Sequence, residues 1–331
     1  MEFKSDIEKK WFEKAKSLQK TIVLPEASYS DRMVKAGIKC AENEIAKIIL
    51  LVKNDNDLDK YNLSAYPSIK VININTSEYL PMLADALYLK RKDKGLTQED
   101  AMKLVHDEVY FATMMVELSL ADGLVAGAEI STSKTFKPAL QIIKGKTKQT
   151  KISSFFVMVR ENNGKEEKYV LADCGMNINP TAEEISEIAK DSAKSAREIA
   201  FVDEPKVALL SYSTKGSAEG DSAIKMREAF NILEKSDVDF IYDGEIQLDA
   251  SIVPEVAKLK CPNSKLKGEA NVLVFPDLES GNIGYKLMAR FGGFKAYGPV
   301  AQGMRKPIND VSRGATVDEI VVTIAITAIQ D

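Results

Sequence analysis

Largely apolar segments alternate with helical segments in the first half of this chain, and this alternation constrains the fold more than any other feature. The segments TIVLPEA (21–27), AKIILLV (46–52) and ADGLVAGA (121–128) lack the polar residue at every second position that a half-exposed strand would carry. Strands of this kind are buried on both faces, and strands separated by helices form parallel sheets. The pattern predicts an α/β fold, with a parallel sheet between two layers of helices.

The pattern changes near residue 150, where KISSFFVMVR, a polar turn and KYVLADC indicate an antiparallel hairpin. Two further buried strands, KVALLSY and NVLVFP, each lead through a loop of small residues toward a helix. We therefore predict two α/β domains. The first combines residues 1–149 with residues 296–331, and the second comprises residues 150–295.

Composition and charge exclude several classes of function. The 331 residues carry a net charge of −4, and this negative charge predicts no affinity for nucleic acid. The longest apolar run, Ile48 to Val52, is too short to span a bilayer. The basic residues near the start are not followed by the uninterrupted apolar segment of a signal peptide. We expect a cytoplasmic protein with small-molecule partners, without a role at nucleic acid or membrane.

Cysteine and histidine are scarce. The three cysteines lack CxxC spacing, and the single histidine, His106, lies in a segment predicted to be helical. Zinc and related metals take cysteine and histidine ligands, so we expect no metal site of this kind. A Ser-His-Asp triad would have to use His106. Acid–base chemistry therefore falls to carboxylates, to lysines or to a substrate group with a low pKa of its own.

Four loops that lead into helices are candidate anion sites, because helix N-termini offer unpaired N–H groups and positive potential. The loop SYSTKGSAEGDS has the glycines, hydroxyls and lysine of a phosphate cradle but not the complete P-loop pattern, so a plain polar loop is equally consistent. In FPDLESGNIGYKLMARFGG, Gly281 and Gly284 would allow close approach of a ligand to the backbone. Lys286 and Arg290 then lie one turn apart on the same helix face.

The third candidate loop gathers hydroxyl groups before a helix. Lys137 lies in that helix beside Pro138, which we expect near the helix start. The hydroxyl groups belong to Ser131, Thr132, Ser133 and Thr135.

The fourth loop, NDVSRGATVDE, precedes an apolar helix. Thr316 and Glu319 have the spacing of a capping box, which accounts for Glu319 without any function, and Asp318 adds a second acid to the first turn. A cap does not account for Arg313, whose planar fork can bind an anion through two hydrogen bonds.

Seven segments together, in order over nearly the whole chain, resemble phosphate acetyltransferase (phosphotransacetylase). They are LPEASYSDR, ADGLVAGAEISTSKTFKPALQIIK, ADCGMNINPTAEEISEIA, LSYSTKGSA, DGEIQLDASIVP, AKLKCPNSKLKGEANVLVFPDLESGNIGYKLMAR and GPVAQGMRKPINDVSRGAT. The resemblance implies reversible acetyl transfer between acetyl phosphate and coenzyme A (CoA), with no bound cofactor and with CoA as a substrate. It implies two α/β domains with a cleft between them, as in the isocitrate and isopropylmalate dehydrogenases, a homodimer and a role in acetate metabolism.

The same resemblance assigns roles to particular residues. Ser312, Arg313 and a carboxylate, Glu319 or its neighbour Asp318, would be catalytic. The residues that would bind substrate are Arg91, Thr132, Lys137, Lys286, Arg290 and Asn309. Two positions depart from the family pattern: Lys137 replaces the usual arginine, and Glu319 replaces the usual aspartate.

Three alternatives stay open at this stage. A phosphate butyryltransferase would share the fold and the chemistry but take a longer acyl chain. A dehydrogenase would need a divalent metal, for which Asp243 and Asp249 are the superficial candidates. A non-catalytic domain that senses CoA or acyl phosphate would bind without turnover. Activation by a monovalent cation, the physiological direction and effectors are not determined by the sequence.

Overall fold

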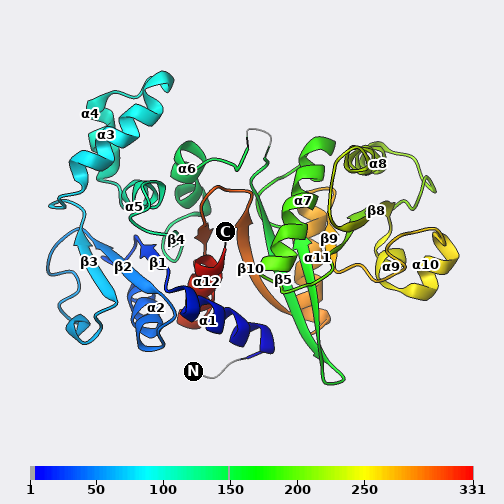
Figure 1. Ribbon diagram of the computed structural model, residues 1–331, viewed down its shortest axis with the longest axis horizontal. Coiled ribbons are helices and arrows are strands. Elements are labelled where there is room, and N and C mark those ends of the chain that lie inside the picture. Colours follow the sequence, from blue (N-terminus) through cyan, green and yellow to red (C-terminus); the bar gives the residue numbers. More distant parts are fainter. Residues whose placement is uncertain (1–3, 148–149, 331) are drawn as a thin grey trace. The chain divides into compact units, whose positions relative to one another are not determined.

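The computed structural model describes residues 4–147 and 150–330, which form two compact units (Figure 1). The first unit comprises the residues up to Lys144 and those from Met304 onward, and the second runs from Gly145 to Gly303. Each unit has its own β-sheet. Within the described residues, no helix is both long and apolar enough to cross a membrane.

The sheet of the first unit has five parallel strands in the order β11-β4-β1-β2-β3, and the three apolar segments predicted to be buried strands form β1, β2 and β4. Because the chain runs from β1 to β2 and β3 on one side and then to β4 on the other, its winding reverses between β1 and β4. Open α/β sheets bind ligands beyond the carboxyl ends of their strands at such a reversal. The strands are β1 (Thr21–Leu24), β2 (Lys47–Val52), β3 (Ile69–Asn73), β4 (Gly123–Ala126) and β11 (Ile308–Asp310).

Two groups of helices cover this sheet (Figure 1). Helices α1 (Asp6–Leu18), α2 (Asp31–Glu42) and α12 (Val317–Ile329) pack together on one side. Helix α12 is apolar around most of its circumference and nine of its residues are buried, so it forms the centre of this layer. The other group consists of α3 (Leu80–Arg91), α4 (Gln98–Val105), α5 (Glu108–Glu117) and α6 (Thr132–Ile142).

The segment predicted to be helical around His106 is divided into α4 and α5. The break follows from Asp107, whose carboxylate accepts the N–H groups of Val109 at 2.9 Å and Tyr110 at 3.1 Å and so caps a new helix. The single histidine, His106, ends α4 in an exposed position, with Nδ1 3.2 Å from the Asn75 side-chain oxygen.

The second unit contains a mixed sheet of six strands in the order β10-β5-β6-β9-β7-β8. Strands β5 and β6 form the predicted antiparallel hairpin, and β6, β9, β7 and β8 are parallel neighbours. Strand β10 pairs antiparallel with β5, so the chain leaves this unit after Gly303, whereas the sequence predicted a return at residue 296. The strand was missed because Pro299 interrupts it, at an irregularity in the pairing. The strands are β5 (Ser153–Asn162), β6 (Lys165–Ala172), β7 (Lys206–Leu210), β8 (Ile241–Ile246), β9 (Val272–Val274) and β10 (Lys295–Gln302).

The helices of the second unit include α7, which begins with a capping box between Thr181 and Glu184. Helix α7 contacts β6, β7, β9 and β10, while α11 contacts β5, β6 and β10. The helices are α7 (Ala182–Glu198), α8 (Asp221–Glu234), α9 (Leu248–Ile252), α10 (Pro254–Lys260) and α11 (Leu278–Phe291).

Candidate functional site

Hydrogen bonds join the loops that follow β1 and β4, at the reversal of the first sheet. Glu26, after β1, is fully buried, and its carboxylate accepts four backbone N–H groups from residues 127–130 at 2.6 to 3.2 Å. Burial raises the pKa of Glu26, while the four N–H donors oppose that rise. Glu26 therefore holds the β4–α6 loop in place. The sequence alone does not reveal this role, because the partners lie about a hundred residues further along the chain.

A second buried carboxylate joins the β4–α6 loop to β11. Asp310, the last residue of β11, accepts hydrogen bonds from the hydroxyl groups of Thr132 at 2.6 Å and Thr135 at 2.7 Å. Burial raises the pKa of Asp310 to about 6, although both hydroxyls stabilise the charged form. Asp310 packs closely against Gly127, which has a φ of +104°. A Cβ at position 127 would lie 2.3 Å from Asp310 Oδ1, so glycine leaves room for the carboxylate. Thr132, a predicted substrate-binding residue, is thus oriented by Asp310.

Ser312 and Arg313 lie in the loop between β11 and α12, and both are exposed. The loop forms a turn in which the Ala315 N–H donates to the Ser312 carbonyl at 2.8 Å. The Ser312 hydroxyl oxygen accepts the Gly314 N–H at 3.2 Å. The Arg313 guanidinium makes no hydrogen bond or ion pair with any residue that the structure describes. An arginine held this way is available to an anionic ligand.

The two acidic residues in the first turn of α12 have different partners. The predicted capping box is confirmed: Glu319 Oε2 accepts the Thr316 N–H at 2.7 Å and its hydroxyl at 3.0 Å. Asp318 instead forms an ion pair with Lys39 at 2.6 Å, and the hydrogen bond from Lys39 lowers its pKa. A cap of this kind stabilises a helix by roughly 0.5–2 kcal/mol. Both contacts of the Glu319 carboxylate fall on Oε2.

Asn309, predicted to bind substrate, does not reach the loop surface. Its side chain is fully buried and donates to the Thr327 hydroxyl at 2.8 Å and to the Gln330 amide oxygen at 2.6 Å. Successive side chains of a strand point to opposite faces. Asp310 therefore faces the site loops, whereas Asn309 faces α12. In this structure the Asn309 side chain connects β11 to α12, and its role in substrate binding stays a prediction.

Arg91 and Lys137 are both associated with α6. The Arg91 guanidinium, at the end of α3, lies 3.4 Å from the carbonyl oxygen of Gln141, one turn beyond Lys137. Lys137 is exposed and makes no ion pair within the described chain. The sequence had suggested that Pro138 lies near the start of this helix. That prediction was wrong, because α6 begins at Thr132 and Pro138 therefore lies inside the helix.

Lys286 and Arg290 lie on α11 in the second unit, and both are exposed. The two glycines of this helix have a structural explanation that the sequence analysis missed. A Cβ on Gly281 would lie 2.4 Å from the Asp173 carbonyl oxygen, and one on Gly284 would lie 3.1 Å from the Phe275 ring. The glycines let α11 pack closely on its own unit, so ligand approach is not needed to explain them.

In the loop SYSTKGSAEGDS, the lysine that could bind a phosphate is already paired within the protein. Lys215 pairs with Asp243 and donates to the Gly244 carbonyl at 2.7 Å. Asp249 pairs with Lys260 at 2.7 Å. The two aspartates that a metal-dependent dehydrogenase would require are therefore each neutralised by a lysine. The described residues include no group of three or more potential metal ligands.

A buried cluster of charged groups lies beyond the carboxyl ends of β1 and β2, and the sequence alone does not reveal it. Glu108 is 2% exposed and contacts Lys53 at 2.9 Å, Lys134 at 2.9 Å and the Tyr29 hydroxyl at 2.9 Å. These partners outweigh the effect of burial and lower the pKa of Glu108 to about 2. Lys134 is thereby held beside the start of α6, although in sequence it is only one lysine of a polar stretch.

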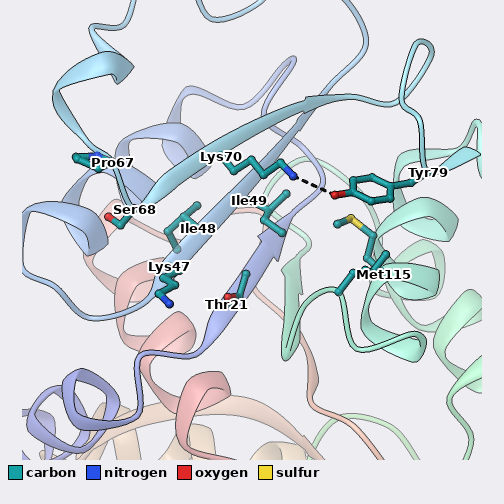
Figure 2. A pocket seen from close by; sticks show the side chains of 10 residues that line it. Thr21, Lys47, Ile48, Ile49, Pro67, Ser68, Lys70, Tyr79 and Met115 are labelled. Atoms are coloured by element: carbon teal, nitrogen blue, oxygen red, sulfur yellow. Dashed lines mark hydrogen bonds between the residues drawn. The ribbon is translucent and has the colours of Figure 1, made fainter.

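A cavity of about 320 Å³ lies at the other end of the first sheet (Figure 2). Thr21 and Lys47, the first residues of β1 and β2, line it, and Lys70 donates to the Tyr79 hydroxyl at 3.1 Å inside it. Its lining includes none of the predicted site residues. The loops described above, at the carboxyl ends of the strands, are therefore the candidate site.

These loops define a class: an α/β protein in which hydroxyl groups, the N-terminus of a helix and an exposed arginine lie at the carboxyl edge of a parallel sheet. Such an arrangement suits an anionic ligand. Residues 6–328 match the family model described as phosphate acetyl/butaryl transferase, and the chain belongs to that family.

Similar proteins agree with this assignment. The chain is 44% identical over 323 residues to the phosphate acetyltransferase of Acetivibrio thermocellus, covering 96% of both chains. Among solved structures, a phosphotransacetylase from Streptococcus pyogenes is 40% identical with a TM-score of 0.92, covering 99% of this chain and 98% of that one. The EutD phosphotransacetylase of Staphylococcus aureus is 39% identical with a TM-score of 0.87, covering 97% and 98%.

Proposed function

We propose that this protein is an acyltransferase that moves an acetyl group reversibly between acetyl phosphate and CoA. The observation that carries the proposal is the exposed Ser312–Arg313 loop directly before the N-terminus of α12. The relatives of this chain are named phosphate acetyltransferase. Acetyl transfer from phosphate to a thiol needs stabilisation of a phosphate leaving group and of an oxyanion. An arginine fork, a hydroxyl and a helix N-terminus supply both.

In the proposed reaction, CoA and acetyl phosphate are bound together. A carboxylate accepts the thiol proton, the sulfur attacks the acetyl carbonyl carbon, and the bond from that carbon to the phosphate oxygen breaks. Phosphate leaves with the electron pair, and the thioester remains. Arg313 neutralises the phosphate, and Ser312 donates a hydrogen bond at the same centre. An unperturbed thiol has a pKa near ~8.5, so a base is useful at neutral pH.

Glu319 is the better candidate for this base than Asp318. Asp318 is held in an ion pair with Lys39, which lowers its pKa and weakens it as a proton acceptor. The capping contacts of Glu319 both fall on Oε2, so Oε1 can accept a proton while the cap persists.

The remaining predicted residues would bind substrate. Lys286 and Arg290 supply positive charge for CoA phosphates, Arg91 and Lys137 supply it beside α6, and Thr132 offers its hydroxyl at the site loop. CoA is a substrate in this scheme, and no bound cofactor is required. The architecture of the isocitrate and isopropylmalate dehydrogenases and a cytoplasmic location in acetate metabolism are parts of the same proposal.

A homodimer is also part of the proposal. On α11, Ile283, Leu287 and Phe291 follow at intervals of four residues and are 57%, 51% and 87% exposed. An exposed apolar stripe along one helix face is typical of an association surface. Sedimentation velocity distinguishes the expected dimer from a monomer.

Thiol release from acetyl-CoA, with and without inorganic phosphate, tests the proposed activity. We expect release that depends on phosphate and is faster with acetyl-CoA than with butyryl-CoA. Faster release from butyryl-CoA would favour the butyryltransferase alternative. CoA binding without turnover would favour a sensing domain, and magnesium-dependent reduction of a nicotinamide would favour a dehydrogenase.

A further inference from the structure

Arg32, at the start of α2, contacts two of the site loops at once. Its Nη1 donates to the carbonyl oxygens of Arg313 at 2.8 Å and Ala315 at 2.7 Å. Its Nη2 donates to the carbonyl oxygen of Ala128 at 2.6 Å and to Glu129 Oε1 at 2.9 Å. The guanidinium therefore bridges the loop after β4 and the loop after β11.

These four acceptors match the four N–H bonds of the two terminal nitrogens of an arginine side chain. No terminal N–H group of Arg32 is left for a substrate phosphate in this arrangement. The contrast with Arg313 is direct, because the Arg313 side chain has no partner within the described chain and is exposed. The two arginines thus have different tasks: one is bound to the protein, and the other is available to a ligand.

The turn that carries Arg313 has few other attachments. The bonds from the Ala315 and Gly314 N–H groups both return to Ser312 within the same turn, so they do not fix the turn to the rest of the unit. Arg32 does fix it, since it holds the carbonyl groups on either side of Gly314. An extended side chain without a partner takes its position from its backbone, and a displacement of about 1 Å at a reacting centre can cost roughly 10²-fold in rate.

We propose that Arg32 is a positioning residue for acyl transfer: it fixes the backbone of the Ser312–Arg313 turn against the β4–α6 loop and acts through that turn. This inference rests on the proposed function, because it assigns Arg32 a role in the reaction that Arg313 would perform.

A double-mutant cycle tests this inference through kcat/KM for acetyl phosphate. Arg32→Ala should lower kcat/KM by roughly 10- to 100-fold. In the Arg313→Ala background, measured at raised enzyme concentration, Arg32→Ala should add less than about threefold, because the group that it positions is gone. Losses that multiply in the double variant would overturn the proposal, as would unchanged turnover in Arg32→Ala.

Two further variants separate positioning from folding. Arg32→Lys keeps a positive charge beside Glu129, but one ammonium cannot hold four acceptors, so it should fold and still lose most of the effect of Arg32. Arg197→Ala removes an arginine that binds a carboxylate and a carbonyl group of Asp239 in the second unit, and it should leave kcat/KM unchanged. Full activity in Arg32→Lys would contradict the proposal.

The wild-type rate in the same assay separates this inference from the proposed function. An inactive wild-type protein would refute acetyl transfer itself. An active wild type with an equally active Arg32→Ala would refute only the role of Arg32.

Discussion

Replacing Asp310 with asparagine tests the buried carboxylate that joins β11 to the start of α6. Asp310 is 5% exposed, and burial raises its pKa from the ordinary 3.8 to about 6 despite the hydroxyl groups of Thr132 and Thr135. The unfolded chain ionises at the ordinary pKa, so stability from this group is fully present below about pH 4 and is lost as the pH rises through about 6. Since a tenfold change in an equilibrium constant is worth about 1.4 kcal/mol, ionising Asp310 in the folded protein costs up to roughly 3 kcal/mol at neutral pH.

Asp310→Asn removes this cost while keeping the size of the side chain. Its amide oxygen accepts one threonine hydroxyl and its NH₂ group donates to the other, so weaker neutral hydrogen bonds replace charge-assisted ones. We expect a net gain of about 1–2 kcal/mol in the free energy of unfolding at pH 7, after roughly 1 kcal/mol is lost from the hydrogen bonds. The gain should shrink toward zero or below by pH 4, as measured by urea denaturation across this range.

Asp191→Asn is a matched comparison in the second unit, because burial also raises the pKa of Asp191 to about 6. Both variants should be stabilised at neutral pH, but only Asp310→Asn should reduce turnover, since Asp310 orients Thr132. An Asp310→Asn protein that is less stable than wild type at pH 7 and keeps the wild-type dependence of stability on pH would contradict a raised pKa of Asp310.

Three further predictions concern the proposed roles. Arg313→Ala should lose turnover by orders of magnitude with an unchanged melting temperature, and Arg313→Lys should recover only part, because the fork is lost; full activity in Arg313→Ala would remove the residue from the mechanism. Neutralising Lys286 and Arg290 should raise KM for CoA but not for acetyl phosphate, by a factor that shrinks as salt increases; equal changes for both substrates would contradict this role. Glu319→Gln keeps the cap but not the base, so turnover should fall by ~10²-fold at neutral pH with little change in melting and recover partly at higher pH. Asp318→Asn should be nearly normal, and the reverse result would transfer the role to Asp318.

The parts of the fold that could be predicted are those with a local cause. Unbroken apolar segments identified strands β1, β2 and β4 of the first unit, because burial on both faces leaves no polar positions. The capping box at Thr316 was found because it lies within four consecutive residues. Strand β10 was missed because its apolar pattern is interrupted by Pro299 and its pairing partner lies far along the chain.

The candidate site was predictable in its residue types and not in its contacts. The Ser312–Arg313 motif could be recognised directly, but the buried supports beneath it could not. Glu26 and Arg32 act on loops about 100 and 280 residues away, which only the folded sheet brings within hydrogen-bonding distance. The burial of Asn309 was not predictable either: the motif assigned it to substrate, and only its position on a strand shows that its side chain lies in the core beside Thr327.

Acetyl transfer from acetyl phosphate to CoA is the activity on which the proposed residue roles depend. The most direct test mixes the purified protein with both substrates and follows thioester formation and phosphate release together. We expect equal amounts of thioester and phosphate, formed far faster than without protein, and a rate lower by orders of magnitude with Arg313→Ala. A thioester rate no higher than that without protein, or phosphate release without thioester, would contradict acetyl transfer by this chain.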